Sequence, residues 1–178
     1  VVFDTSFHST MPPKAYMYAI PYEYYTKYKI RRYGFHGTSH RYVSKHCAHL
    51  MHQPLEDLNM ITCHIGNGSS IAAIRDGKVI DTTMGLTPLD GFMMGTRSGS
   101  LDPSIVTFIM EQEGLTPGEM SDILNMKSGM YGICGYSDDR DVTKAEIEGD
   151  PKAILAHEML TYQIAKYIGS YITAMGGL

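Results

Sequence analysis

The sequence predicts an α/β fold in which a three-stranded meander is followed by helices. Three strand-like runs follow one another between residues 59 and 84, and helical patterns come after them. The composition, 43% hydrophobic and 19% charged over 178 residues, is typical of a globular protein. This length allows one well-buried domain and part of a second. The helices are expected at 103–113, 117–127 and 151–175.

The meander is predicted from the turn chemistry between its strands, at 59–64, 70–75 and 78–83. Asp76-Gly77 joins the second and third strands and is a strong short-range hairpin signal. The long segment 84–101 that follows is expected to be an ordered loop, and loops of this length are usually functional.

The residues before the meander are harder to assign. Residues 1–8 are predicted to be a strand that ends near Asp4. The connector 9–33 is rich in tyrosine, which we expect to pack against the protein. Its prolines argue against a regular helix there. These prolines are Pro12, Pro13 and Pro21.

A helix is predicted from Thr38, because Thr38 or Ser39 can cap it and apolar residues recur at helical spacing behind them. The expected buried face consists of Val43, Cys47, Leu50 and Met51. Three histidines recur on the same helix, but their spacing spreads them around it and no cluster completes four zinc ligands. We therefore expect exposed histidines at His46, His49 and His52.

Charge and cysteine usage narrow the class of protein. The net charge of −4 argues against nucleic acid as a partner, and the short basic cluster 27–32 is expected to be a solvated loop. Cys47 and Cys63 lie in apolar patterns, as expected for buried, reduced thiols of a cytoplasmic protein. No apolar run approaches the roughly 20 residues that span a bilayer, and no secretory signal is present. We predict no membrane partner.

The turn His64-Ile65-Gly66-Asn67-Gly68-Ser69-Ser70 can bind an anion. Glycine lets the backbone approach a phosphate closely, and successive N–H groups in such a turn form an anion-binding concavity. The alternative is an ordinary hairpin turn.

A second segment, 31–40, brings His36 to the N-terminus of the predicted helix, where free N–H groups and the helix dipole favour anions. His36 could donate a hydrogen bond to charge that develops on a transferred group. A capped helix with a satisfied histidine is the alternative.

In the loop 84–101, Arg97 lies among glycines, where its planar guanidinium could hold a phosphate or carboxylate at two points. The alternative is a surface salt bridge. Nearby apolar residues could hold a small alkyl group, namely Phe35, Leu86 and Pro88.

Two acidic sites remain. The carboxylate of Asp4 could bind Mg²⁺ together with substrate phosphates, or it could cap a turn. The segment 137–141, which contains Asp138 and Arg140, could contact a nucleotide or form a solvated loop. The sequence leaves both alternatives open.

Together these segments resemble the acetate kinase family, of the superfamily that includes sugar kinases and actin. The matching stretches are VFDTSFH (2–8), RYGFHGTSH (32–40), HIGNGSS (64–70) and the run 81–99 with Asp102-Pro103 after it. They occur in the same order and run from one end of the chain to the other. Cys134 and Ser100 depart from the residues that the family more often has.

The resemblance implies an actin-like ATPase (ribonuclease H-like) lobe, incomplete at both ends. Residues 1–8 would form the edge of an N-terminal lobe and 9–178 a truncated second lobe. Both ends look cut, so we expect an internal piece of a longer protein that is inactive alone. The intact protein would be a phosphotransferase with a carboxyl group as acceptor. It would move the ATP γ-phosphoryl group reversibly to acetate, giving acetyl phosphate and ADP.

The resemblance also implies roles for individual residues. Asp4 would bind Mg²⁺, His36 would stabilise the transferring phosphoryl group, and Arg97 would orient the acyl substrate. Phe35 and Pro88 would line the methyl pocket. The residues expected near the nucleotide are His64, Gly66, Asn67, Gly68, Asp138 and Arg140.

Two alternatives stay open. Propionate kinase shares these motifs, and a wider pocket around Phe35, Leu86 and Pro88 would distinguish it. A non-catalytic nucleotide-binding or dimerisation module belongs to a different class. A homodimer is what the family implies, with acetate, acetyl phosphate and ATP or ADP as small-molecule partners.

Overall fold

The computed structural model describes residues 3–177 and divides the chain into two compact units. The first unit contains the residues up to 65, then 69–90, and the end of the chain from Ala165 onward. The second contains 66–68 and 91–164.

The sheet of the first unit confirms the predicted meander. It consists of β1 (Met60–His64), β2 (Ser70–Arg75) and β3 (Lys78–Thr82), antiparallel in that order. The turn between β2 and β3 has positive φ at Asp76 (51°) and Gly77 (71°). Positive φ at both central residues is the requirement of a type I′ hairpin turn, which explains the Asp-Gly signal.

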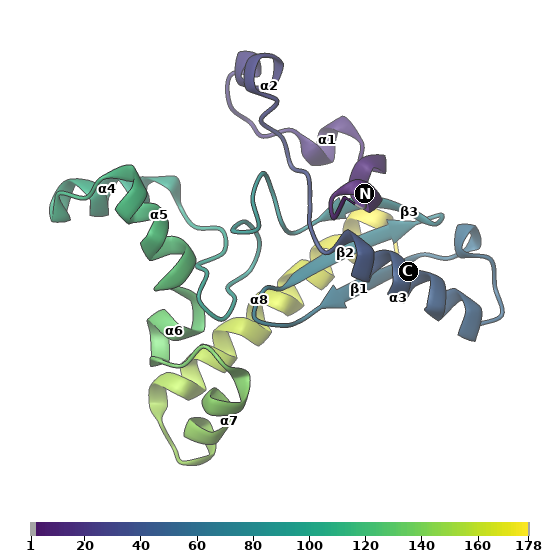
Figure 1. Ribbon diagram of the computed structural model, residues 1–178. Helices are drawn as coiled ribbons and strands as arrows, with labels where there is room; N and C mark the ends of the chain where they lie inside the picture. Colours follow the sequence, from purple (N-terminus) through teal and green to yellow (C-terminus); the bar gives the residue numbers. More distant parts are fainter. Residues whose placement is uncertain (1–2, 178) are drawn as a thin grey trace. The chain divides into compact units, whose positions relative to one another are not determined.

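Helices flank this sheet (Figure 1). The helix α3 (Gly37–Leu50) packs against β1, and the last turns of α8 (Pro151–Met175) lie behind the sheet in the view shown. Tyr171 and Met175 of α8 are buried there. The middle strand is inaccessible as a result: every residue from Ser70 to Ile74 has an exposed fraction of 0%. The sheet therefore supports the side chains on the inner face of α3.

The predicted helix from Thr38 is confirmed, but its predicted buried face is wrong. Val43, Leu50 and Met51 are exposed and Cys47 is half-buried. The face that packs on the sheet is formed by small and polar residues instead, namely Gly37, His40, Ser44 and Ala48. Polar side chains can be buried where they hydrogen-bond to one another, which the spacing of apolar residues does not reveal.

The predictions for the N-terminal residues need correction. Val1 and Val2 lie outside the described residues, and the rest of the predicted strand is a turn followed by the 3₁₀-helix η1 (Ser6–Thr10). The connector forms two short helices, α1 (Pro13–Tyr16) and α2 (Tyr22–Tyr28). Their prolines stand at the helix starts, where proline's missing N–H costs nothing.

The expected packing of the tyrosines holds only in part. In α2, which projects from the first unit (Figure 1), three tyrosines are exposed, namely Tyr22, Tyr24 and Tyr28. Tyr16 does pack: its ring lies against Tyr25, and the guanidinium of Arg31 lies 3.7 Å from its ring centre.

The second unit is helical. The predicted α4 (Pro103–Glu113), α5 (Pro117–Met126) and α8 are confirmed, and the segment 84–101 is a loop as predicted. Two helices had no sequence prediction, α6 (Gly129–Cys134) and α7 (Asp139–Ile147). Its core consists of Met93, Met130, Val142, Ala145 and Ala153.

Two further expectations can be checked. All three cysteines are free, but Cys63 is exposed and not buried as predicted. Within the residues that the structure describes, no helix combines the length and apolar character needed to cross a bilayer.

Gly34 offers a test of the packing between the connector and the sheet. Its φ is +74°, and a Cβ there would lie 2.5 Å from Thr82 Cγ2 and 2.7 Å from His8 Cδ2. We expect Gly34→Ala to lower the free energy of unfolding by about 3 kcal/mol, from backbone strain plus overpacking. Urea denaturation measures this.

Gly114→Ala is the matched control, because Gly114 has a similar φ (+64°) and nothing within 4 Å of the added Cβ. It should cost only the backbone strain, about 1–2 kcal/mol. Equal losses in the two variants would show that Thr82 and His8 do not constrain position 34.

Candidate active site

The segment that carries His36 is anchored by Arg32, which is not the solvated residue that we predicted. Its Nη1 donates to the carbonyl oxygens of Thr82 (2.8 Å) and Thr83 (2.7 Å), and its Nη2 lies 3.2 Å from the Asp90 carboxylate. A half-buried guanidinium needs several acceptors, and the end of β3 supplies them. The backbone that follows Arg32 is therefore fixed to the edge of the sheet.

His36 and Asp4 are held together at the start of α3. His36 is the residue before the first helical turn, with a left-handed φ of 57°. Its backbone N–H donates to Oδ2 of Asp4 at 2.7 Å, and the next N–H, of Gly37, donates to the Asp4 carbonyl at 2.9 Å. A Cβ at residue 37 would collide with that carbonyl oxygen, so glycine is required there.

Asp4 thus occupies a turn and not the predicted strand end, yet it lies beside His36 as the predicted site needs. In the described part of the chain, its second carboxylate oxygen, Oδ1, has no protein partner. Within residues 3–177, no group of three or more histidine, cysteine or acidic side chains is placed to hold a metal ion. Mg²⁺ needs no such cage, because it binds through one or two carboxylates together with substrate phosphates. Asp4 fits that requirement.

The segments around residues 36 and 64 meet, as predicted. The imidazole rings of His36 and His64 are stacked, with their centroids 4.0 Å apart. Ser39 holds His64 by a hydrogen bond of 2.9 Å to Nδ1, and Ser70 lies 2.8 Å from Nδ1 of His36. Both rings are therefore positioned by hydroxyl groups.

A third histidine, which the sequence analysis did not single out, lies behind this pair. His40 is 1% exposed, and its ring nitrogens contact Thr62 Oγ1 and Ser70 Oγ, both at 2.8 Å. Burial, followed by the positive charge of neighbouring histidines, lowers the pKa of His40 to about 3. Its ring is thus neutral at ordinary pH. The only sequence signal was its position four residues after His36, on the same helical face.

The predicted alkyl pocket draws on two neighbouring segments of the first unit. The N–H groups of Tyr33 (3.0 Å) and Gly34 (3.3 Å) both donate to the Gly85 carbonyl. These two hydrogen bonds hold the residues just before Phe35 next to the residues just before Pro88. The Phe35 carbonyl is itself held by Nε2 of His8 at 2.8 Å.

Tyr18 secures the other side of this loop. Its hydroxyl donates to Oδ2 of Asp90 and accepts from the N–H of Leu86, both at 3.0 Å. Burial and the Asp90 charge raise the pKa of Tyr18 to about 12, so the hydroxyl stays a donor.

Asn67 and Arg97 lie in the second unit. The Asn67 carbonyl accepts from the N–H of Gly95 at 3.2 Å, and a Cβ at residue 95 would collide with the Asn67 side chain. The backbone of Arg97 is paired with Met94 at 3.0 Å, and its Nη1 lies 3.8 Å from the Met94 sulfur. The turn 66–68 and the arginine loop are therefore packed together.

Asp138 and Arg140 are not in a solvated loop but at the start of α7. Asp138 caps that helix by accepting from the N–H of Arg140 at 2.9 Å. Its carboxylate also pairs with the Arg140 guanidinium at 2.6 Å, and these bonds lower the pKa of Asp138 to about 2. Contact of either residue with a nucleotide stays a prediction.

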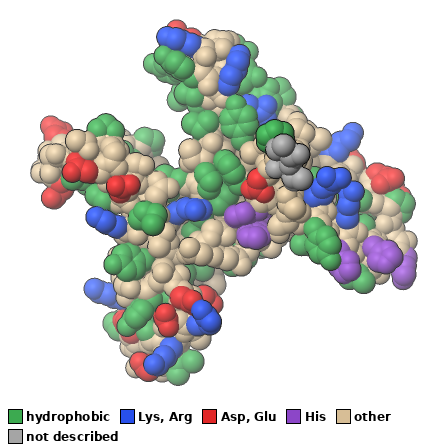
Figure 2. Space-filling model, in the orientation of Figure 1, with side chains coloured by type: hydrophobic (Ala, Val, Ile, Leu, Met, Phe, Trp, Pro, Cys, Tyr) green, Lys and Arg blue, Asp and Glu red, His purple; other side chains and the backbone are tan. Residues whose placement is uncertain are grey.

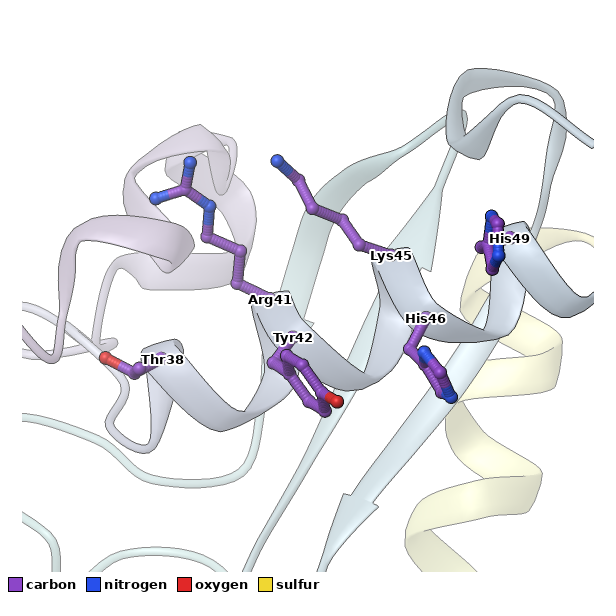
Figure 3. Close-up of a pocket in the computed structure, with 6 residues that line it drawn as sticks. All are labelled: Thr38, Arg41, Tyr42, Lys45, His46 and His49. Carbon is purple, nitrogen blue, oxygen red and sulfur yellow. The ribbon is translucent and has the colours of Figure 1, made fainter.

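The hollow drawn in Figure 3 is lined by none of the predicted site residues. It has a volume of about 450 Å³ and is lined by Thr38, Arg41, Tyr42, Lys45, His46 and His49. Their side chains project outward from the surface of α3 and do not converge (Figure 3). His46, His49 and His52 are exposed as predicted, and histidines gather at that end of α3 in Figure 2.

The structure thus groups the predicted site residues by unit. The first unit carries Asp4, Phe35, His36, His64 and Pro88, and the second carries Gly66, Asn67, Gly68, Arg97, Asp138 and Arg140. That His36 and Arg97 face one oxyanion stays a prediction.

A carboxylate and an imidazole lie together at one helix N-terminus, where backbone N–H groups and the helix dipole favour anions. The profile of the acetokinase family matches residues 1–178, and the chain belongs to that family.

Curated relatives named acetate kinase are close in sequence. The protein of Thermotoga maritima is 63% identical over 179 residues, and that of Carboxydothermus hydrogenoformans is 60% identical over 177. Each alignment covers 99% of this chain but 44% of the relative. The chain therefore spans less than half the length of these relatives.

Solved structures agree with the fold. The acetate kinase of Porphyromonas gingivalis matches 99% of this chain with a TM-score of 0.98 at 50% identity, over 45% of its own length. A propionate kinase from Francisella tularensis matches 97% with a TM-score of 0.94, also at 50% identity, over 44% of its own length. The predicted fold class is thereby confirmed for the residues that the structure describes.

The low pKa of His40 predicts how stability depends on pH. Between about pH 6.5 and 3 the unfolded chain binds a proton at this residue and the folded chain does not. The contribution is complete above pH 6.5 and is lost as the pH falls. At pH 4.5 the loss should be about 2–3 kcal/mol relative to pH 7, measured by urea denaturation.

His40→Gln should flatten this part of the stability profile, because glutamine does not titrate. His49→Gln is the matched control, since His49 is exposed on the same helix. The explanation fails if His40→Gln and His49→Gln have the same slope between pH 7 and 4.5.

Proposed function

We propose that this chain is part of an acetate kinase, which transfers the γ-phosphoryl group of ATP reversibly to acetate with Mg²⁺. The observation that carries this proposal is the hydrogen bond of 2.7 Å between Asp4 and the backbone of His36. It holds a carboxylate beside an imidazole at a helix N-terminus, where anions are favoured, and this arrangement supports a role of Asp4 in binding Mg²⁺. The identity of about 60% with curated acetate kinases supports it.

The proposed mechanism is direct in-line transfer between aligned oxygens, in which the protein positions groups and neutralises charge. Asp4 would hold Mg²⁺, which offsets the charge of the phosphates. His36 would donate a hydrogen bond to the transferring phosphoryl group. Arg97 would orient the carboxylate of acetate and balance transition-state charge.

The remaining roles follow the same proposal. The turn at residues 66–68, with His64 before it, would contact the nucleotide phosphates through its backbone. Asp138 and Arg140 would lie near the nucleotide. Phe35 and Pro88 would enclose the acetate methyl group. We also propose a cytoplasmic homodimer, as the family resemblance implies, and the three free cysteines fit a reducing compartment.

We assign the chain to the second lobe of the kinase, with residues 1–8 at the edge of the first. Since the chain spans less than half of its relatives, we expect residues 1–178 alone to show little or no kinase activity. A hydroxamate assay for acetyl phosphate distinguishes a catalytic chain from a non-catalytic nucleotide-binding or dimerisation module.

A propionate kinase is the second candidate, and the structural match to the propionate kinase of Francisella tularensis favours it specifically. The side chain that would discriminate is Leu86, which is 42% exposed beside Gly85 and Pro88. Steady-state kinetics on acetate and propionate, measured side by side, decide between the two.

Replacing Arg97 tests the substrate role. In the complete enzyme, Arg97→Ala should lower kcat/KM for acetate by about 10³-fold or more, because a well-placed arginine is worth that much in phosphoryl transfer. Lys144→Ala, which removes an exposed cation of the same unit that has no proposed role, is the comparison. A kcat/KM within threefold of wild type for Arg97→Ala would contradict the role.

Replacing Asp4 tests the metal site. Asp4→Asn keeps an acceptor for the His36 N–H but removes the charge that would hold Mg²⁺. We expect the Mg²⁺ concentration for half-maximal activity to rise at least tenfold. An unchanged Mg²⁺ titration with wild-type circular dichroism would exclude Asp4 as the metal ligand.

A further inference from the structure

A continuous chain of hydrogen bonds leads from the interior of the first unit to His36. It runs from Thr62 on β1 to His40 on α3, from His40 to Ser70 on β2, and from Ser70 to Nδ1 of His36. Each of the three contacts is 2.8 Å. Thr62, His40 and Ser70 are 5%, 1% and 0% exposed, so water does not substitute for any of these partners.

The direction of this chain is fixed by counting protons. Ser70 has one hydroxyl hydrogen and two histidine neighbours, so it donates to one ring and accepts from the other. A neutral His40 likewise has one N–H and one acceptor nitrogen. The low pKa of His40 keeps its ring neutral. All the bonds must then point the same way, either toward His36 or away from it.

Only one of the two directions satisfies Thr62. If the bonds point toward His36, the Thr62 hydroxyl donates to Nδ1 of His40 and its proton is used. If they point away, His40 donates to Thr62, and the hydroxyl proton is left with no acceptor among the described residues. A buried donor without a partner costs about 1–3 kcal/mol. That penalty selects the direction toward His36.

We infer that Thr62, His40 and Ser70 form a positioning relay that holds His36 as the tautomer with its hydrogen on Nε2. In this direction the Ser70 hydroxyl donates to Nδ1 of His36, so the ring hydrogen must lie on the other nitrogen. Nε2 is then a hydrogen-bond donor, which is the form that a developing phosphoryl charge requires. This use of the relay rests on the proposed function, whereas the tautomer itself does not.

Neighbouring groups support the same assignment. His64 stacks on His36 and is held by Ser39, while His8 packs edge-on against His40 and donates to the Phe35 carbonyl. None of these contacts uses Nδ1 of His36. The contact of Ser70 with Nδ1 therefore acts on a ring nitrogen that none of these neighbours shares.

Thr62 gives the sharpest test, because it does not touch His36. Thr62→Val removes the hydroxyl while keeping the shape, and Thr62→Ser keeps the hydroxyl as the matched control. In the complete enzyme we expect Thr62→Val to lower kcat severalfold with KM for acetate and ATP within twofold of wild type. Ser70→Ala, which breaks the relay next to His36, should lower kcat about 10–100-fold. Thr62→Ser should stay within twofold of wild type.

The tautomer is read directly by NMR of the complete protein labelled with ¹⁵N-histidine, with His36→Gln identifying the His36 signals. Wild type and Thr62→Ser should show the Nε2–H form. Ser70→Ala and Thr62→Val should show a mixture of tautomers. This signal does not depend on turnover, so it tests the relay even if the protein fails to phosphorylate acetate.

Several results would overturn the relay. One is an Nδ1–H tautomer in wild type, and another is an unchanged tautomer in both Ser70→Ala and Thr62→Val. A kcat loss equal in Thr62→Val and Thr62→Ser would show a packing role only. If Ser70→Ala does not fold, the Thr62 pair still decides.

Discussion

The guanidinium of Arg32 is the contact on which the first unit depends. It collects carbonyl oxygens from the end of β3 and the carboxylate of Asp90, so one side chain joins the connector, the sheet and the following loop. The glycine and histidine segment begins immediately after it. Because a charge in this position cannot be left unpaired, the backbone leading to His36 has little freedom. Arg32 therefore helps to fix the position of the His36 ring.

Local sequence signals predicted the parts of the fold that local chemistry determines. Asp76-Gly77 requires positive φ at both positions, and Pro103 and Pro117 begin helices behind good capping residues, so these elements were assigned correctly. These features depend on neighbours along the chain. The candidate site was suggested by residue type alone, and the reason for one of its glycines, Gly37, is the carbonyl of Asp4, a partner distant in sequence.

The wrong predictions for α3 and for Arg32 have the same cause. In both, the residues that decide burial are paired with partners distant in sequence. Val43 and Leu50 had the spacing of a buried face, yet α3 buries His40 and Ser44, because Thr62 and Ser70 on the sheet satisfy the imidazole. Arg32 looked solvated until the carbonyls of β3 were in place. The spacing of apolar residues in one sequence predicts which faces are apolar. It does not predict a buried polar layer that is built from side chains of α3, β1 and β2.

The neutral, buried ring of His40 links two properties of the protein, its stability at low pH and the arrangement of its candidate site. The imidazole that we infer to order the candidate site is also a group whose protonation at low pH should destabilise the fold. A lineage adapting to an acidic interior could replace His40 with a group that never ionises. It would then lose the hydrogen bond through which the inferred relay sets the tautomer of His36. Tolerance of low pH and rate of turnover would therefore be expected to evolve in opposition at this single position.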